Sequence, residues 1–493
     1  MRTRMLKTLV IALAVGAVAG ARAQVPQAPP SSKAVILKGK APVSDEVLRV
    51  KLPRPKEADL PNGLHLIVLE DRRVPRVTFQ LLMPGAGGYY DPADLPGLAG
   101  VTAAVMREGT TTRSSQQLSE QLESIAATLS VSAGISTSEA SVSGSCLTED
   151  VGTLFELFAD VLLNPSFPED ELARYRQRTK AGLIQQRSSA GFLGNEMFAK
   201  VLYGNHPAGR VSTTPEALDK VTRAALVEAH RTRYVPDHAV LAIAGDISQA
   251  EAQKLVASKL GAWKRAGTPA PAVAQPPDPE SPRVYFVARP KSVQTNLVVG
   301  APGIERLDPD YDALEVMNKI LGGGPSGRLF MVLREEKSYT YGAYSGVSAT
   351  RWRGTWQATT EVRTEVTEPA LRDLLAQVTR MRDEEVPVKE FRDQQRSLVA
   401  SFALSLENPQ QMIGYYVTSW RFSLPADYWD KYPERVMAVT QAQVQAVARK
   451  YLNPSRLQIV AVGEPGKVGE ILKGFGPVET YDTEGKRIPS SSE

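Results

Sequence analysis

The sequence predicts an α+β protein made of two similar domains, each with a mainly antiparallel sheet covered by helices on one face. Three observations lead to this prediction. Strand and helix patterns stop at a proline-rich segment and restart after it. Landmarks recur at a fixed spacing, since Pro84-Gly85 and Pro302-Gly303 are 218 residues apart, as are Gly245 and Gly463. Strands come in runs instead of alternating with helices, which favours antiparallel pairing.

The N-terminus predicts an export signal. Residues 1–23 combine a basic start, an apolar run from Leu9 to Ala19 and the small-residue ending Ala21-Arg22-Ala23. The apolar run is short for a membrane span. We therefore expect cleavage before Gln24 and a mature chain without an integral membrane segment, in a Gram-negative periplasm or secreted. Residues 24–59 are rich in proline and serine and predict a flexible lead-in.

The first domain is expected over residues 60–266. Short apolar or alternating runs predict its strands, at 64–69, 77–83, 129–135, 140–146 and 239–244. Apolar residues at helical spacing predict its helices, at 98–105, 118–125, 151–163, 168–188 and 223–234.

Residues 267–282 contain six prolines and predict a stiff linker. The second domain is expected over residues 283–480, followed by a tail at 481–493. Its predicted strands are 284–287, 296–300, 341–348, 355–360 and 457–462, and its predicted helices are 309–321, 369–384, 388–406 and 441–451. We interpret the aromatic run Tyr415–Trp429 as core, with a partner interface as the alternative.

Composition and charge exclude several classes of protein. A single cysteine, Cys146, excludes a disulfide framework and a cysteine-rich zinc or iron–sulfur site. The predicted signal carries four of the 58 basic residues and no acidic residue, so the mature chain has 54 of each sign. A balanced charge gives no electrostatic reason to expect a nucleic-acid partner.

The glycine-rich segment Gly322–Gly327 fits G-x-G-x-x-G, which dinucleotide-binding folds place between a strand and a helix. Here the segment follows a predicted helix, so we do not interpret it as a dinucleotide site. Of the chain's four histidines, no two have the i, i+4 spacing of a zinc-binding helix. We therefore interpret the histidines as structural.

Several strings resemble the M16 (pitrilysin/insulinase) metallopeptidase family over about residues 60–475. These strings are Leu60–Leu64, Gly97–Ala99, Gly109-Thr110, Tyr203–Pro207, Gly327–Leu329 and Leu333–Lys337. The resemblance implies two repeated α+β domains arranged as a clamshell, and a zinc-dependent peptidase chemistry.

The family's zinc motif, H-x-x-E-H, is absent from this chain. In the family the motif lies between the Gly-x-Ala and Gly-Thr strings, where its histidines supply zinc ligands and its glutamate acts as base. The resemblance places the histidine positions on Gly100 and Ala104 and the glutamate position on Ala103. The window expected to hold the third ligand reads Lys180-Ala181-Gly182. We therefore expect no metal in this chain.

The second domain keeps a pair that the family uses across the clamshell. The resemblance assigns Arg334 and Tyr341 to hydrogen bonding of substrate and oxyanion at a zinc site. The alternative is a surface arginine paired with a neighbouring glutamate, together with a packed strand tyrosine. Gly322, Gly323 and Gly324 match the glycine-rich, peptide-binding loop of two-chain members, with a helix end and turn as the alternative.

We therefore expect a non-catalytic, substrate-binding subunit of a heterodimeric M16 peptidase, with no activity alone. Its partners are a peptide and a homologous chain with an intact H-x-x-E-H motif, and that chain holds the zinc. Three alternatives stay open: a structural or peptide-binding scaffold of peptidase-like fold, a homodimer that sequesters peptides, and a free-standing peptidase with an unrecognised site.

Overall fold

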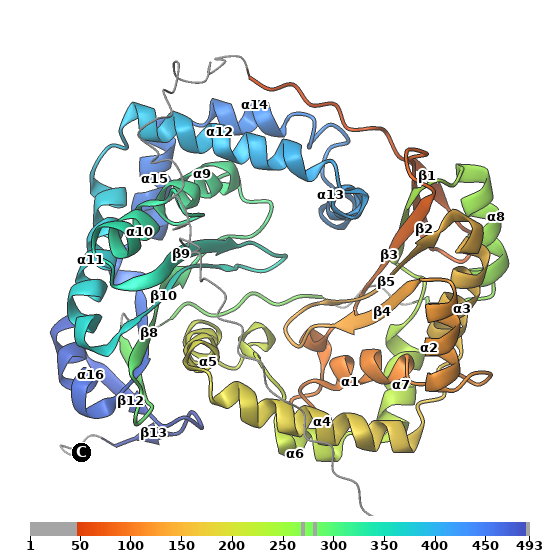
Figure 1. The fold of residues 1–493 in the computed structure, drawn as a ribbon, viewed down its shortest axis with the longest axis horizontal. Coiled ribbons are helices and arrows are strands. Elements are labelled where there is room, and N and C mark those ends of the chain that lie inside the picture. Colours follow the sequence, from red (N-terminus) through yellow and green to blue (C-terminus); the bar gives the residue numbers. More distant parts are fainter. Residues whose placement is uncertain (1–46, 268–271, 280–282, 490–493) are drawn as a thin grey trace, which may run out of the picture. The chain divides into compact units, whose positions relative to one another are not determined.

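The protein contains two mixed β-sheets with helices packed on them (Figure 1). The structure is a computed structural model and describes residues 47–267, 272–279 and 283–489. The first sheet has the strand order β1-β2-β6-β3-β5-β4, and the second has the order β13-β12-β7-β11-β8-β10-β9. The core order β2-β6-β3-β5-β4 of the first sheet is thus repeated as β7-β11-β8-β10-β9 in the second. This confirms the α+β class with two similar halves.

The elements of the first half are β1 (Lys56–Asp59), β2 (His65–Glu70), β3 (Arg76–Pro84), α1 (Leu98–Met106), α2 (Ser115–Ser124), β4 (Thr128–Ala133), β5 (Glu139–Leu147), α3 (Val151–Leu163), α4 (Glu169–Arg187), α5 (Ala190–Tyr203), α6 (Pro215–Lys220), α7 (Arg223–Arg233), β6 (Val240–Gly245) and α8 (Gln249–Leu260). The predicted strands and helices of this half all form, with ends shifted by a few residues.

The elements of the second half are β7 (Val284–Ala288), β8 (Gln294–Pro302), α9 (Tyr311–Leu321), α10 (Arg328–Phe330), a π-helical turn (Met331–Glu336), β9 (Thr340–Ser348), β10 (Thr355–Arg363), α11 (Thr367–Asp383), α12 (Val388–Ser405), α13 (Pro409–Phe422), α14 (Tyr432–Ala438), α15 (Gln441–Tyr451), β11 (Gln458–Gly463), α16 (Pro465–Leu472), β12 (Val478–Tyr481) and β13 (Arg487–Ile488).

The expectation of mainly antiparallel sheets is only partly right. β2 pairs parallel to β6, and β7 pairs parallel to both β11 and β12, while the remaining pairs are antiparallel. The parallel partners are far apart in sequence, so local strand runs carry no sign of them. β6 and β11 are buried along their whole length, which explains why both are continuous apolar runs.

The described residues include parts of the expected lead-in, linker and tail, but not the expected signal. Residues 1–23 and the lead-in up to residue 46 lie outside the described residues. Residues Lys56–Asp59, expected in the lead-in, form β1, because their backbone completes a ladder with β2 from Lys56↔Val68 to Asp59↔His65. The expected tail contains β13, which pairs with β12. The described part of the linker, 272–279, has no regular secondary structure.

Each sheet is covered on both faces, and not on one as the sequence suggests. The helices of the same half cover one face, and in the first sheet they pack on Leu241 and Ile243 of β6. The other face receives a helix from the other half of the chain. α13 packs on Val240, Ala242 and Ala244 of the first sheet, and α5 packs on β8 and β11 of the second. Residues Val47–Glu493 thereby form one compact unit.

The α5 and α13 helices occupy matching places in the two halves. Each has 14 residues, and each follows the long helix α4 or α12. α13 contains most of the aromatic run, and Tyr416 lies in its buried cluster with Met412 and Ile413. The interpretation of that run as core is thus right for Tyr416, while Tyr415, Trp420 and Trp429 are half-buried and pack against the same cluster. Among the described residues, no helix is both long and apolar enough to cross a membrane.

We predict that Ile413→Ala lowers the free energy of unfolding by about 2–5 kcal/mol, because it removes a buried side chain where α13 meets the first sheet. Urea unfolding of the mature chain measures the change. Gln411→Ala, at an exposed position of the same helix, is the control and should change it by less than about 0.5 kcal/mol. Equal effects of the two variants would contradict the packing described.

Candidate functional site

The helix that corresponds to the zinc helix, α1, is fully formed. Its apolar face, Leu98, Val101 and Val105, is buried in the first core. Its first turn is fixed by the Asp91 carboxylate, which accepts hydrogen bonds from the N–H groups of Gly97 at 2.9 Å and Ala99 at 3.1 Å. Burial raises the pKa of Asp91, although hydrogen bonds and the Arg233 guanidinium oppose this. Arg233 pairs with Asp91 at 2.8 Å.

Gly100 and Ala104 lie one turn apart on the half-buried side of α1, and Ala103 is buried. A Cβ added at Gly100 would lie 3.4 Å from the Ala133 carbonyl oxygen of β4. The helix is regular at these positions, and their side chains carry no ligand atoms.

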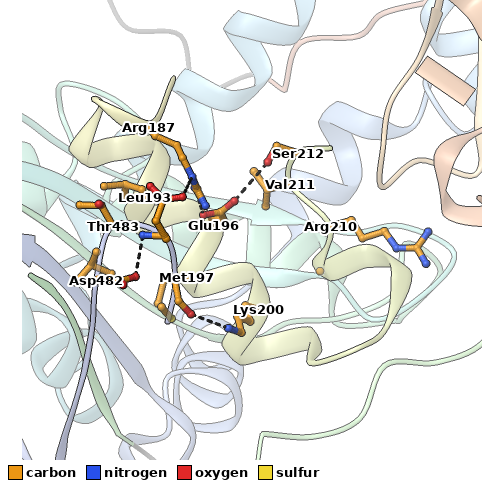
Figure 2. Close-up of a pocket in the computed structure, with 14 residues that line it drawn as sticks. Arg187, Leu193, Glu196, Met197, Lys200, Arg210, Val211, Ser212, Asp482 and Thr483 are labelled. Atoms are coloured by element: carbon orange, nitrogen blue, oxygen red, sulfur yellow. Dashed lines mark hydrogen bonds and ion pairs between the residues drawn. The ribbon is translucent and has the colours of Figure 1, made fainter. Parts of the chain in front are cut away.

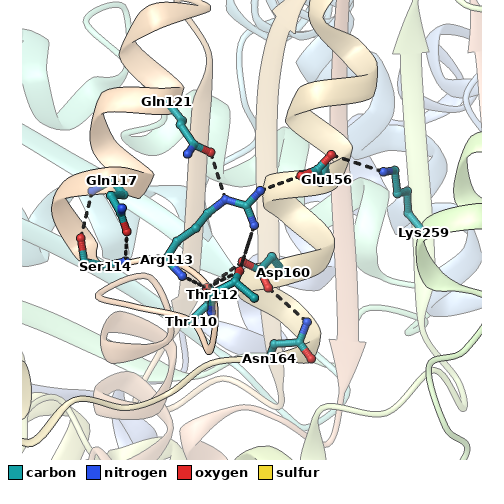
Figure 3. A network of polar contacts seen from close by, with 10 residues as sticks. All are labelled: Thr110, Thr112, Arg113, Ser114, Gln117, Gln121, Glu156, Asp160, Asn164 and Lys259. Atoms are coloured by element: carbon teal, nitrogen blue, oxygen red, sulfur yellow. Dashed lines mark hydrogen bonds and ion pairs between the residues drawn. The ribbon is translucent and has the colours of Figure 1, made fainter.

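The segment after α1 is held against α3 by a polar network centred on Asp160 (Figure 3). The Asp160 carboxylate, 7% exposed, accepts hydrogen bonds from the Thr110 and Thr112 hydroxyls at 2.7 and 2.8 Å. It also pairs with Arg113 at 2.8 Å. Burial pushes the pKa of Asp160 upward, but these hydrogen bonds prevail and hold that pKa below its ordinary value of 3.8.

In the second half, Arg334 and Tyr341 open onto one cavity of about 620 Å³, lined by Gln294, Arg334, Glu335, Ser338, Tyr339, Thr340, Tyr341, Glu361 and Arg363. Tyr341 is 91% exposed, and within the described part of the chain its hydroxyl has no hydrogen-bond partner. Arg334 pairs with Glu335 and lies 4.8 Å from the Phe330 ring centroid. The structure thus brings the expected pair to one exposed place.

Both residues lie on irregular backbone. Arg334 is in the π-helical turn Met331–Glu336. Ser338, between the two, has φ +53°, a left-handed conformation that is unfavourable for a residue with a side chain. The pairing of β9 with β10 shifts register opposite Thr360–Val362, so Tyr341 and Gly342 form a bulge. Bulges re-aim side chains, which explains why Tyr341 points to solvent.

The glycine-rich segment serves to close the edge of β9. Gly322 ends α9, and its carbonyl accepts the N–H of Ser345 at 2.8 Å, while Asn318 donates to the Ser345 carbonyl at 3.3 Å. A Cβ at Gly322 would lie 2.6 Å from the Ser345 hydroxyl, and one at Gly323 would lie 2.8 Å from the Lys319 Cα. Glycine is therefore required here by close packing. Of the three, Gly324 has the most room, with only the flexible Lys319 amine within reach.

A second cavity, of about 240 Å³, lies between α5, the segment before α6 and the turn after β12 (Figure 2). Its charges satisfy one another. Arg187 pairs with Glu196 at 2.8 Å and with Glu484 at 3.3 Å, and Lys200 donates to the Gly485 carbonyl at 3.3 Å. These contacts fasten the C-terminal hairpin to α5, so we interpret the cavity as structural.

Two protein-family models match consecutive segments of this chain. "Insulinase (Peptidase family M16)" matches residues 66–212, and "Peptidase M16 inactive domain" matches residues 220–398. The chain belongs to the M16 family.

Individual M16 relatives agree with this assignment. An uncharacterized zinc protease of Mycobacterium leprae is 26% identical over 58% of this chain, and the match spans 64% of the relative's length. A non-peptidase homolog of Helicobacter pylori is 24% identical over 57% of this chain and 64% of its own length.

Solved structures show the same fold. The M16 inactive domain from Pseudomonas fluorescens superimposes with a TM-score of 0.78 at 28% identity, covering 84% of this chain and 98% of that one. A protease from Helicobacter pylori, at 17% identity and a TM-score of 0.76, covers 83% of this chain and all of that one.

The M16 zinc site does not fit the residues present. Gly100, Ala103 and Ala104 have no side-chain nitrogen, oxygen or sulfur. The third-ligand window Lys180–Gly182 lies on α4, which packs against α1, and it contains no carboxylate. Among the described residues, no three histidine, cysteine, aspartate or glutamate side chains are grouped to hold a metal. His206 and His230 instead hydrogen-bond backbone carbonyls, of Ala274 and Leu162.

The sequence alone did not identify Arg363 or Ser338, which line the same cavity as Arg334 and Tyr341. The spacing of Arg334 and Tyr341 was readable from the sequence, but a positive φ and a long-range contact have no local signal. The network around Asp160 was also missed. Its only sequence trace is a set of hydroxyl residues after the Gly109-Thr110 string.

We predict that Asp160→Asn lowers the free energy of unfolding at pH 7 by about 3 kcal/mol, because a neutral amide replaces the buried carboxylate that accepts hydrogen bonds from Thr110, Thr112 and Arg113. Since the pKa of Asp160 is lowered in the folded state, its charge stabilises the fold above pH 3.8 and this stabilisation is lost as pH falls through the folded-state pKa. The difference from wild type should therefore shrink below pH 3.8.

The matched control for this experiment is Glu156→Gln, which removes the exposed partner of the same Arg113. It should cost less than about 1 kcal/mol. Denaturant titrations between pH 3 and 7 measure both variants. An Asp160→Asn effect no larger than that of the control, or one that does not change with pH, would contradict the role given to the network.

We predict that Gly322→Ala destabilises the chain by about 1–3 kcal/mol, because the added methyl collides with Ser345 at the closed edge of β9. Gly324→Ala, two residues away, meets only a flexible amine and should have little effect. Thermal unfolding compares the two. If both are neutral, the segment is free of the β9 edge, as a peptide-binding loop would be.

Proposed function

We propose that this chain is the non-catalytic, substrate-binding subunit of a heterodimeric M16 zinc peptidase. In this proposal it contributes Arg334 and Tyr341 to the zinc site of a homologous chain that carries an intact H-x-x-E-H motif. The substrate is a peptide. The export signal that the sequence predicts supports the Gram-negative periplasm as the compartment, with secretion as the alternative.

One observation supports the proposal above the others: the ligand positions of α1 carry no donor atoms, whereas the Arg334–Tyr341 segment keeps irregular backbone. A π-helical turn, a left-handed serine and a bulge follow one another between residues 331 and 342. π-Helical turns and β-bulges are frequent at functional sites. All three features lie in the segment whose residues line the open cavity.

The two side chains suit the stabilisation of developing negative charge. A guanidinium and a phenol are hydrogen-bond donors, and neither needs to give up a proton to act. Donors fixed where an oxyanion forms lower the barrier to peptide hydrolysis. In the absence of substrate Arg334 is paired with Glu335. Substrate binding would have to exchange that pair for a contact with the peptide.

A scaffold without a part in proteolysis is the second candidate. Two observations favour it: the Helicobacter pylori relative is named a non-peptidase homolog, and the Gly322-Gly323 turn is packed against β9 and α9 instead of standing open. The two candidates differ in whether the Arg334 side chain affects hydrolysis by the assembled complex.

We predict that Arg334→Ala lowers kcat/KM of the reconstituted complex by about 10²- to 10³-fold, as loss of an oxyanion donor does. Tyr341→Phe should lower it in the same direction, because only the hydroxyl is removed. Hydrolysis of a fluorogenic peptide by the purified two-chain complex measures both variants.

Arg372→Ala on α11 is the control, since it is an exposed arginine that pairs with Glu368 away from the cavity. Its activity should equal that of the wild type. If the complex assembles at normal yield with Arg334→Ala and hydrolyses the peptide at the wild-type rate, the scaffold candidate is the better description.

A further inference from the structure

The corner between Arg334 and Tyr341 is tied to β10 by one arginine. The Nη1 of Arg363, the last residue of β10, donates to the Ser338 carbonyl at 2.8 Å, and its Nε donates to Glu365 at 3.0 Å. Ser338 in turn donates its own N–H to the Arg334 carbonyl at 3.1 Å. Arg363 therefore hydrogen-bonds directly to Ser338, the residue with the left-handed backbone conformation.

A second contact lies on the other side of the same corner. The Thr340 hydroxyl donates to the Glu361 carbonyl of β10 at 2.7 Å and accepts the N–H of Gly342 at 3.1 Å. It thereby fixes the bulge that aims Tyr341. The segment from Arg334 to Tyr341 is thus held at Ser338 by a side chain and at Thr340 by the strand itself.

We propose that Arg363 is a positioning residue, which holds Arg334 and Tyr341 at the mutual placement that substrate requires. This inference rests on the proposed function, since it names how the same pair is kept in place. The left-handed Ser338 ends the helical segment, and the N–H groups of Ser338 and Tyr339 close this turn on the carbonyls of Arg334 and Leu333. Arg363 adds the side-chain tie from this turn to β10, and without that tie the turn would be free to shift and to move Arg334 relative to Tyr341.

Arg363 differs from a residue that only adds stability. Its side chain is 52% exposed, so its ion pair with Glu365 contributes little to folding. It lines the cavity together with Arg334 and Tyr341. The expected loss on substitution is therefore one of geometry at the cavity, and small displacements of positioned groups cost catalysis heavily.

The first experiment uses the mature chain alone and needs no partner. Hydrogen–deuterium exchange is followed at the amides of Ser338, Tyr339 and Gly342, which are hydrogen-bonded in the corner. Arg363→Gln should speed their exchange at least fivefold, while Arg363→Lys, which keeps a donor for the Ser338 carbonyl, should restore most of the protection. Arg380→Gln, a similarly exposed arginine paired with Glu384, is the control.

The second experiment uses the complex with the zinc-bearing chain. Arg363→Gln should lower kcat/KM about tenfold or more without a shift of the melting temperature beyond that of Arg380→Gln. In the background Arg334→Ala/Tyr341→Phe the same substitution should have no further effect, because it acts through those two residues. Full additivity in that background would overturn the proposal.

Failure of this inference is distinguishable from failure of the proposed function. If Arg334→Ala leaves hydrolysis unchanged, the proposed function fails, and the exchange experiment alone decides whether Arg363 holds the corner. If Arg334→Ala lowers hydrolysis but Arg363→Gln matches the Arg380→Gln control in exchange and in kcat/KM, the proposed function stands and the positioning role is wrong.

Discussion

The structure depends on two helices, one from each half of the chain, each of which packs on the sheet of the other half. The central strands β6 and β11 are apolar on both faces, so neither sheet can leave a face in water. The free face of the first sheet is covered by α13, and that of the second by α5. Each helix thus covers an apolar sheet face of the other half, which the helices of that other half leave uncovered. The two halves are consequently stabilised together.

This arrangement explains how the M16 zinc chemistry can be lost without loss of the fold. α1 is held by its apolar face and by Asp91 at its first turn, and neither involves Gly100, Ala103 or Ala104 as ligands. The segment that follows α1 is held by Asp160 and Arg113. The frame around the zinc positions is therefore supported by residues that are independent of a metal. In the second half the Arg334–Tyr341 corner is held in part by hydrogen bonds of Arg363 and Thr340 within and to β10.

Most of the fold could be predicted from the sequence because it is encoded locally. The runs at β6 and β11, and the helical spacing of α3, identify those elements without any partner. The helices α5 and α13 were not predicted, because each packs on a sheet that is distant in the sequence. For α13, the aromatic run predicted only that its residues are buried. The parallel pairing of β2 with β6 was missed for the same reason: the partners are distant in sequence.

For the candidate site, the sequence predicts which residues are present, and the structure adds where they are. Arg334, Tyr341 and the positions without ligand atoms could be identified from motifs, but the packing of Gly322 against Ser345 could not.

We propose above all that this chain works with a zinc-bearing M16 chain. The most direct test is a pull-down of the tagged mature protein from its native cell envelope, with mass spectrometry of the captured chains. The proposal predicts a homologous chain with an intact H-x-x-E-H motif in near one-to-one ratio, and recovery without any such chain would contradict it.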